Sequence, residues 1–105
     1  MAITEVTFQN YQAEVSQSES PVLLDFYADW CGPCKMLHSE LEAFAEEAND
    51  IKVCQVNVDN AQELAQLFGI LSIPTLVLIK SGQEAARRVG GCEKADIDAF
   101  VRGNL

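Results

Sequence analysis

Two cysteines separated by two residues are the part of this sequence best suited to chemistry. Cys31 and Cys34 lie in the run Trp-Cys-Gly-Pro-Cys-Lys, which begins at Trp30. Two thiols at this spacing can close a disulfide and open it again, so the pair suits redox cycling. Gly32 permits a tight turn, and Pro33 fits the first turn of a helix, where its missing N–H breaks no hydrogen bond.

The elements on either side of the pair explain why the first cysteine would be reactive. Residues 22–27 form an apolar run typical of a buried strand, and an amphipathic helix begins at the cysteine pair. Cys31 is therefore expected at a helix N-terminus, where free N–H groups and the helix dipole stabilise a thiolate, the attacking species. Cys34 lies one turn further on and is expected to act as the resolving thiol.

A lone carboxylate, Asp25, interrupts the apolar strand. Burial there disfavours the charged form and raises the pKa unless a partner compensates. Because the strand leads into the cysteine loop, we expect Asp25 to lie beneath Cys34 and to accept its proton as a general base, directly or through one water. The alternative is an ordinary carboxylate near the strand end that pairs with a lysine.

A structural zinc site is the other chemistry that a cysteine pair can serve. Four ligands are needed, and Cys54 and Cys92 form no second closely spaced pair, so zinc is disfavoured and no metal is expected. His38 is expected on the same helix as Cys34, where a solvent-facing histidine is more common than a ligand. We assign it no role.

The hydrophobic pattern predicts a single α/β domain over residues 1–105 in the order β-α-β-α-β-α-β-β-α. Strands separated by helices favour parallel pairing, and a two-residue hairpin at Ser81 and Gly82 forces one antiparallel pair. We expect a mixed sheet with helices on both faces. The expected strands are residues 3–6, 22–27, 52–58, 75–80 and 83–89, and the expected helices are residues 7–15, the long helix that carries a stripe from Leu37 to Ala48, and residues 60–68 and 94–101.

Charge and hydropathy exclude several classes of protein. Seven basic and sixteen acidic residues give a net charge of −9, which argues against binding to nucleic acid or to anionic membranes. The longest apolar run, residues 69–79, is too short for a membrane helix and contains Pro74. Residues 1–8 lack the basic and apolar regions of a secretory signal, so we expect a cytoplasmic protein.

Over nearly its whole length the chain resembles the thioredoxin family. The resemblance is carried by residues 22–27 with Asp25, residues 30–36, Asn57 with Asp59, residues 69–75, and Val89 with Gly90. It implies a thioredoxin fold with about five strands and four helices, and a general protein-disulfide reductase that carries electrons without a cofactor. Cys31 would be the nucleophile, Cys34 the resolving thiol and Asp25 the buried base, and a thioredoxin reductase would restore the dithiol.

The resemblance also implies how substrates dock. The backbone at Ile73 would pair with a disulfide-containing protein substrate, on a flat apolar surface around the cysteine motif. General frequencies favour a trans bond before Pro74, whereas the resemblance implies a cis bond. We expect a monomer. The substrate-binding residues would be Trp30, Gly32, Pro33, Ile73, Pro74 and Gly90.

Four positions fall outside the common pattern of the family. Ser39 replaces a helix-kinking proline, which predicts a straighter helix. Gln55 replaces a lysine near the buried aspartate, which should leave the pKa of Asp25 higher. Cys54 is expected to be a small, inert, buried side chain. Cys92 would lie near the docking surface, where oxidation is chemically feasible, but we assign it no role.

Two other functions are open to a protein with these features. An oxidase or isomerase on the same fold is favoured by a histidine between the cysteines and by an export signal, and this chain has Gly32 and Pro33 there. A non-catalytic docking module would use the surface and leave the thiols idle. The set of Asp25, Cys31, Cys34 and Pro74 argues against that module.

Overall fold

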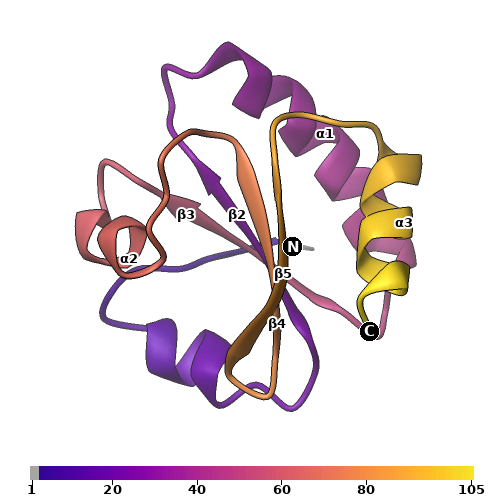
Figure 1. Cartoon of the computed structure of the whole chain (residues 1–105), viewed down its shortest axis with the longest axis horizontal. Coiled ribbons are helices and arrows are strands. Elements are labelled where there is room, and N and C mark those ends of the chain that lie inside the picture. Colours follow the sequence, from indigo (N-terminus) through magenta and orange to yellow (C-terminus); the bar gives the residue numbers. More distant parts are fainter. Residues whose placement is uncertain (1–2) are drawn as a thin grey trace.

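The structure is a computed structural model that describes residues 3–105, so Met1 and Ala2 of the predicted domain lie outside it. The order of elements is the predicted one (Figure 1). No helix in the described part of the chain is long and apolar enough to cross a membrane. The elements are β1 (Ile3–Glu5), η1 (Gln12–Ser16), β2 (Val22–Tyr27), α1 (Gly32–Glu47), β3 (Lys52–Asn57), α2 (Gln62–Leu67), β4 (Thr75–Lys80), β5 (Gln83–Val89) and α3 (Lys94–Gly103).

The five strands form one mixed sheet in the order β1-β3-β2-β4-β5, which confirms the predicted α/β architecture. β3 pairs in parallel with β1 and with β2, whereas β4 is antiparallel to both β2 and β5. The expectation of a single antiparallel pair is therefore wrong. α2 has only six residues, about 9 Å of helix, so the chain does not return along the sheet, and β4 starts at the end where β3 finishes.

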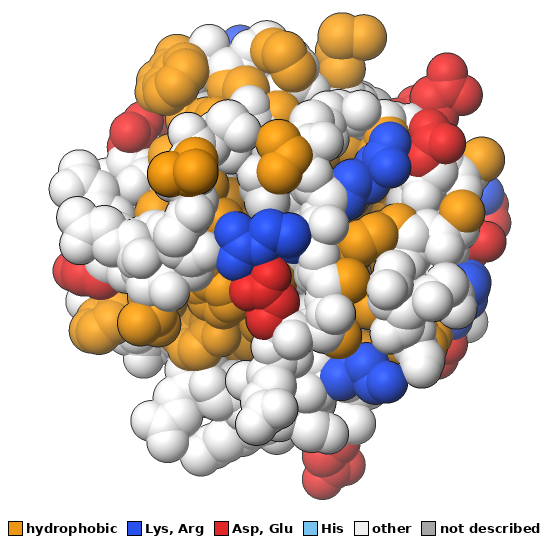
Figure 2. All heavy atoms as spheres, in the orientation of Figure 1, with side chains coloured by type: hydrophobic (Ala, Val, Ile, Leu, Met, Phe, Trp, Pro, Cys, Tyr) orange, Lys and Arg blue, Asp and Glu red, His pale blue; other side chains and the backbone are white. Residues whose placement is uncertain are grey.

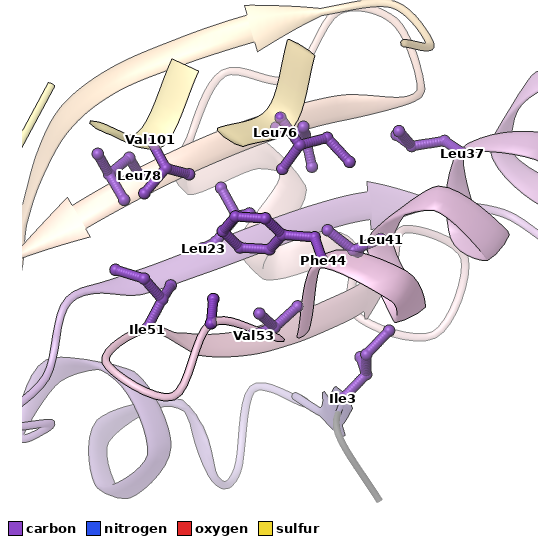
Figure 3. Close-up of a cluster of buried hydrophobic side chains, with 12 residues drawn as sticks. Ile3, Leu23, Leu37, Leu41, Phe44, Ile51, Val53, Leu76, Leu78 and Val101 are labelled. Carbon is purple, nitrogen blue, oxygen red and sulfur yellow. The ribbon is translucent and has the colours of Figure 1, made fainter. Parts of the chain in front are cut away.

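Helices cover both faces of the sheet, as predicted. In Figure 1, α1 and α3 lie on one side and α2 lies on the other. Beneath α1 and α3, the stripe of Leu37, Leu41 and Phe44 packs on sheet residues such as Leu23 and Leu76, and all of these side chains are buried (Figure 3). A second apolar cluster joins the opposite sheet face to η1 and α2. Burial on both faces explains why β2 reads as a nearly continuous apolar run.

The helix predicted over residues 7–15 is present, but its type and bounds differ: residues 8–10 form a turn, and a π-helix follows at Gln12–Ser16. The Thr7 N–H donates to Asn10 Oδ1 at 2.7 Å, and the Asn10 N–H donates to Thr7 Oγ1 at 3.3 Å. This reciprocal pair of bonds, three residues apart, has the pattern of a capping box and satisfies backbone donors at the start of the segment.

The other element boundaries differ little from the predicted ones. β1 and β3 each end one residue earlier than expected, α2 is shorter at both ends, and α3 runs on to Gly103. The two-residue hairpin between β4 and β5 is confirmed. Ser81 (φ 52°) and Gly82 (φ 78°) both have positive φ, as a hairpin turn that follows the twist of its strands requires.

Candidate functional site

The cysteine pair lies where β2 ends and α1 begins. Cys31 is the N-cap of α1, and its Sγ accepts a hydrogen bond of 3.3 Å from the backbone N–H of Cys34. Cys31 and Cys34 are joined by a disulfide with their Cα atoms 5.3 Å apart. Pro33 lies in the first turn of the helix, as expected. The sulfur of Cys31 is therefore placed to receive a backbone donor at the positive end of a helix, which favours a thiolate.

Asp25 is buried in the centre of the sheet, with 1% of its surface exposed. Burial raises its pKa to about 7, and the negative charge of Glu5 adds to the increase. None of the ion pairs among residues 3–105 includes Asp25, so the alternative of a lysine partner is wrong. A carboxyl group whose pKa lies near neutrality can both accept and release a proton under ordinary conditions.

A cavity of about 490 Å³ connects this carboxyl group with the second cysteine of the pair. Asp25 and Cys34 both line it, together with His38 and Gln55. His38 was assigned no role from the sequence. It lies four residues after Cys34 on α1, and this i, i+4 spacing could have indicated that the two side chains share one face of the helix. Its Nε2 atom also lies 3.5 Å from Glu42.

A polar group at the edge of the sheet borders Asp25 and was not predicted. The hydroxyl of Tyr27 donates to the Glu5 carboxylate at 3.1 Å, and Gln55 Nε2 donates to the same carboxylate at 2.6 Å. Burial, followed by the charge of Glu5, raises the pKa of Tyr27 to about 12, so the hydroxyl stays protonated as a donor. Asp25 pairs with Gln55 in the strand register, and Gln55 with Glu5.

The loop before β4 contacts the cysteine pair, as the resemblance implied. The Ile73–Pro74 bond is cis, so the expectation from general frequencies is wrong and the one from the resemblance is confirmed. Ile73 packs against the small buried cluster that contains Cys31 and Cys34. The N–H of Gly90, which has φ 97°, donates to the Pro74 carbonyl at 2.8 Å. Ile73 therefore lies against the disulfide, and Gly90 is bonded to the residue that follows Ile73.

An exposed apolar surface surrounds these residues. The side chain of Trp30 is 71% exposed, and it lines a shallow hollow with Leu71 and Ile73. On the other side of the motif, Pro33 and Met36 line a second hollow. In Figure 2, hydrophobic side chains gather at the top of the molecule, where Figure 1 places the loop before α1 and the start of that helix. Of the residues predicted to bind substrate, Trp30 and Ile73 line the first hollow and Pro33 lines the second.

The two remaining cysteines lie outside the disulfide. Cys54 is fully buried among the side chains on the η1 and α2 face, and burial raises its pKa to about 11. Its placement agrees with the prediction of an inert apolar side chain. Cys92 is partly buried, follows Gly91 in the loop after β5, and lines the hollow beside Pro33 and Met36.

Comparisons with known proteins agree with one another. A family model described as Thioredoxin matches residues 2–103. A thioredoxin of Pseudomonas aeruginosa is 38% identical over 98% of this chain and 96% of the relative, and one of Acidithiobacillus ferridurans is 40% identical over 99% and 97%. A thioredoxin of Mycobacterium bovis is 46% identical over 90% of this chain and 82% of the relative.

Proposed function

Since this chain belongs to the thioredoxin family and is a thiol-disulfide oxidoreductase, we propose that it reduces protein disulfides with Cys31 as nucleophile and Cys34 as resolving thiol. The observation that carries this assignment is the disulfide at the start of α1, with a backbone N–H directed at the sulfur of Cys31. The attacking sulfur needs that stabilisation, whereas the second sulfur must lie within bonding distance and lose its proton.

Reduction takes place in two exchanges, starting from the dithiol form. The thiolate of Cys31 attacks one sulfur of the substrate disulfide, a mixed disulfide forms, and the other substrate sulfur leaves as a thiolate. Cys34 then loses its proton and attacks Cys31 Sγ, which releases the second substrate sulfur and closes the disulfide between Cys31 and Cys34. The substrate gains two electrons and two protons, and this protein loses them.

Asp25 is the proposed acceptor of the proton that Cys34 must lose. It lines the same cavity as Cys34, its surface is almost fully buried, and its pKa of about 7 suits proton transfer near neutral pH. After the second exchange it can pass the proton on to the departing substrate thiolate or to solvent. The other titratable residues that line this cavity in the described part of the chain, besides Cys34 itself, are only partly buried or exposed: Tyr27, Asp29, Lys35 and His38.

Substrate recognition is assigned to the apolar surface around the motif. Trp30, Gly32, Pro33 and Gly90 would contact the substrate chain, and the backbone at Ile73, which precedes the cis Pro74, would pair with it. A partner that docks by charge should present a basic face, because the chain carries a net charge of −9. We assign the return of electrons to a thioredoxin reductase, and we propose that the protein works as a cytoplasmic monomer.

The test is the reduction of insulin disulfides by dithiothreitol, followed as turbidity with and without the protein. The wild type should accelerate the reaction strongly, and Cys34→Ser and Cys31→Ser should each return the rate to the background of dithiothreitol alone. Retention of full activity by Cys31→Ser would refute the mechanism. Absence of acceleration by the wild type would favour a docking module instead.

A further inference from the structure

Three polar side chains form one row across the sheet on the face covered by α1. The register places Glu5 opposite Gln55 and Gln55 opposite Asp25, two residues after an apolar row of Ile3, Val53 and Leu23. Alternate residues of a strand point to the same face, so the polar row lies on the same face as the apolar one. The row runs from exposed Glu5 at the edge strand to buried Asp25 in the centre.

The orientation of the Gln55 amide is fixed by Glu5. A carboxylate accepts hydrogen bonds and donates none, so the group of Gln55 that faces Glu5 must be its NH₂, and Nε2 lies 2.6 Å from Glu5 Oε1. The opposite orientation would place two acceptors against each other. The hydroxyl of Tyr27 donates to both oxygens of the same carboxylate, at 3.1 and 3.3 Å, and so holds it in place.

This orientation turns the carbonyl oxygen of Gln55 away from Glu5, and that oxygen is left without a partner. Gln55 Oε1 and Asp25 Oδ1 are the two buried side-chain atoms of residues 3–105 that lack a hydrogen-bond partner. They belong to residues paired on adjacent strands, which lie about 4.8 Å apart. Two such acceptors repel when Asp25 is ionised, whereas a protonated Asp25 supplies the one donor that satisfies both.

We propose that Glu5 and Gln55 are positioning residues for Asp25: Glu5 holds the amide of Gln55 so that Gln55 Oε1 accepts the hydrogen bond of the protonated Asp25 carboxyl group. The inference rests on the proposed function, in which Asp25 accepts the proton of Cys34. It adds that the edge strand determines how tightly that proton is held. The Gln55 amide donates to Glu5 through its Nε2 and accepts from Asp25 through its Oε1. Its fixed orientation therefore carries the effect of Glu5 to the buried carboxyl group.

Other groups that face Asp25 do not replace this arrangement. From β4 the paired residue is apolar Leu76. The remaining titratable groups around the cavity are Tyr27, Asp29, Cys34, Lys35 and His38, and none of them is a hydrogen-bond partner of Asp25. The charge of Glu5 acts in the same direction as the amide, since it helps to raise the pKa of Asp25. Both effects of removing Glu5 are therefore expected to lower the pKa of Asp25.

The experiment is a titration of the Asp25 carboxyl carbon by NMR in the oxidised full-length protein, with Asp25→Asn used to assign the signal. Glu5→Gln removes the charge and frees the Gln55 amide to turn its NH₂ toward an ionised Asp25. We expect the proton affinity of Asp25 to fall about threefold or more in this variant. Glu63→Gln, the same change on exposed α2, should leave the titration of Asp25 unchanged.

The Gln55 side chain gives a second readout that a merely structural role would not move. Its carbonyl carbon signal should follow the Asp25 titration near pH 7 in the wild type and should be constant there in Asp25→Asn. The proposal would be overturned if Asp25 titrated equally in Glu5→Gln and Glu63→Gln. It would also be overturned if the Gln55 carbonyl carbon signal did not change as Asp25 titrates. The insulin assay is independent of both readouts, so its failure would count against the proposed function alone.

Discussion

The indole N–H of Trp30 donates a hydrogen bond of 2.9 Å to Asp59 Oδ2, although 29 residues separate the two along the chain. Asp59 is itself held by Asn57, whose Oδ1 accepts from the Asp59 backbone N–H at 2.9 Å. The bond joins the loop after β3 to the loop that carries the cysteines. It fixes the orientation of a mostly exposed aromatic ring at the edge of the proposed docking surface.

Removing that bond should loosen the ring without unfolding the protein. In Asp59→Ala the fluorescence anisotropy of Trp30, the only tryptophan, should decay faster, and insulin reduction should slow about fivefold, equivalent to ~1 kcal/mol. The free energy of unfolding should change by less than about 1 kcal/mol, because the bond is exposed. Asp59→Asn keeps an acceptor and should behave like the wild type. An unchanged anisotropy in Asp59→Ala would show that packing alone holds the ring.

The two active-site cysteines should play different parts in the reaction with a small disulfide reagent. In a Cys92→Ser background, the reduced protein should release two equivalents of thionitrobenzoate from Ellman's reagent and close its disulfide, because the second thiol displaces the first adduct. Additional Cys34→Ser should stop the reaction after one equivalent, with the adduct retained on Cys31 and visible by mass spectrometry. An adduct that does not persist in that variant would assign the resolving step to another group.

Stability should depend on pH through Asp25. Its pKa is raised from 3.8 to about 7 on folding, so the folded state holds the proton more tightly than the unfolded state. Its favourable contribution is therefore complete below pH ~4, declines as the pH rises, and is gone above pH ~7, a loss of about 4 kcal/mol. Asp25→Asn should not show this loss. Guanidinium unfolding of both oxidised proteins at pH 4 and pH 8 measures the difference, and parallel behaviour of the two would contradict the raised pKa.

Only one of the two thiols outside the disulfide should react in the folded protein. At pH 8, iodoacetamide should label the oxidised native chain once, at the partly exposed Cys92, because burial raises the pKa of Cys54 to about 11. Unfolding without a reductant should expose the second site. Cys92→Ser should then remain unlabelled in the native state, and mass spectrometry of the digested protein identifies the labelled residue. Rapid native labelling of Cys54 would show that its strand opens.

The hairpin after β4 should tolerate no side chain at Gly82. A Cβ there would lie 3.3 Å from the carbonyl oxygen of Ser16, at a φ of 78° that L side chains rarely adopt. Gly82→Ala should destabilise the protein by about 1–2 kcal/mol. Gly103→Ala, at the end of α3, meets nothing within 4 Å and should be neutral or slightly stabilising. Equal unfolding midpoints for the two variants would show that the turn adapts.

Most of the sheet and the cysteine motif could be predicted because their signals are local. The apolar run of β2, the stripe on α1 and the turn at Ser81 and Gly82 are each encoded within a few residues. The direction of β4 could not be predicted in this way, since it depends on the length of the connection from β3. The helix predicted over residues 7–15 is present as a turn followed by a π-helix, because apolar periodicity does not record which hydrogen-bond spacing the backbone adopts.

The residues of the site likewise differ in whether local sequence could predict them. Cys31, Cys34 and Asp25 are conspicuous from residue type and context, and the structure brings Asp25 and Cys34 to one cavity. Glu5 gave no signal, because an exposed glutamate on a short edge strand looks like any surface charge. Its relation to Asp25 depends on the register of three strands, and both pairings between these strands join distant parts of the chain. That information exists only once the sheet has formed.

The two borders of the sheet bear on how this protein handles other polypeptides. β1 has only three residues, and the outer strand β5 carries Glu84, Arg87 and Arg88. Short or charged border strands discourage a second chain from adding along them, which is a common route to aggregates. A protein that exchanges disulfides with other proteins comes close to extended segments of their chains. Borders of this kind disfavour the addition of those segments to its own sheet.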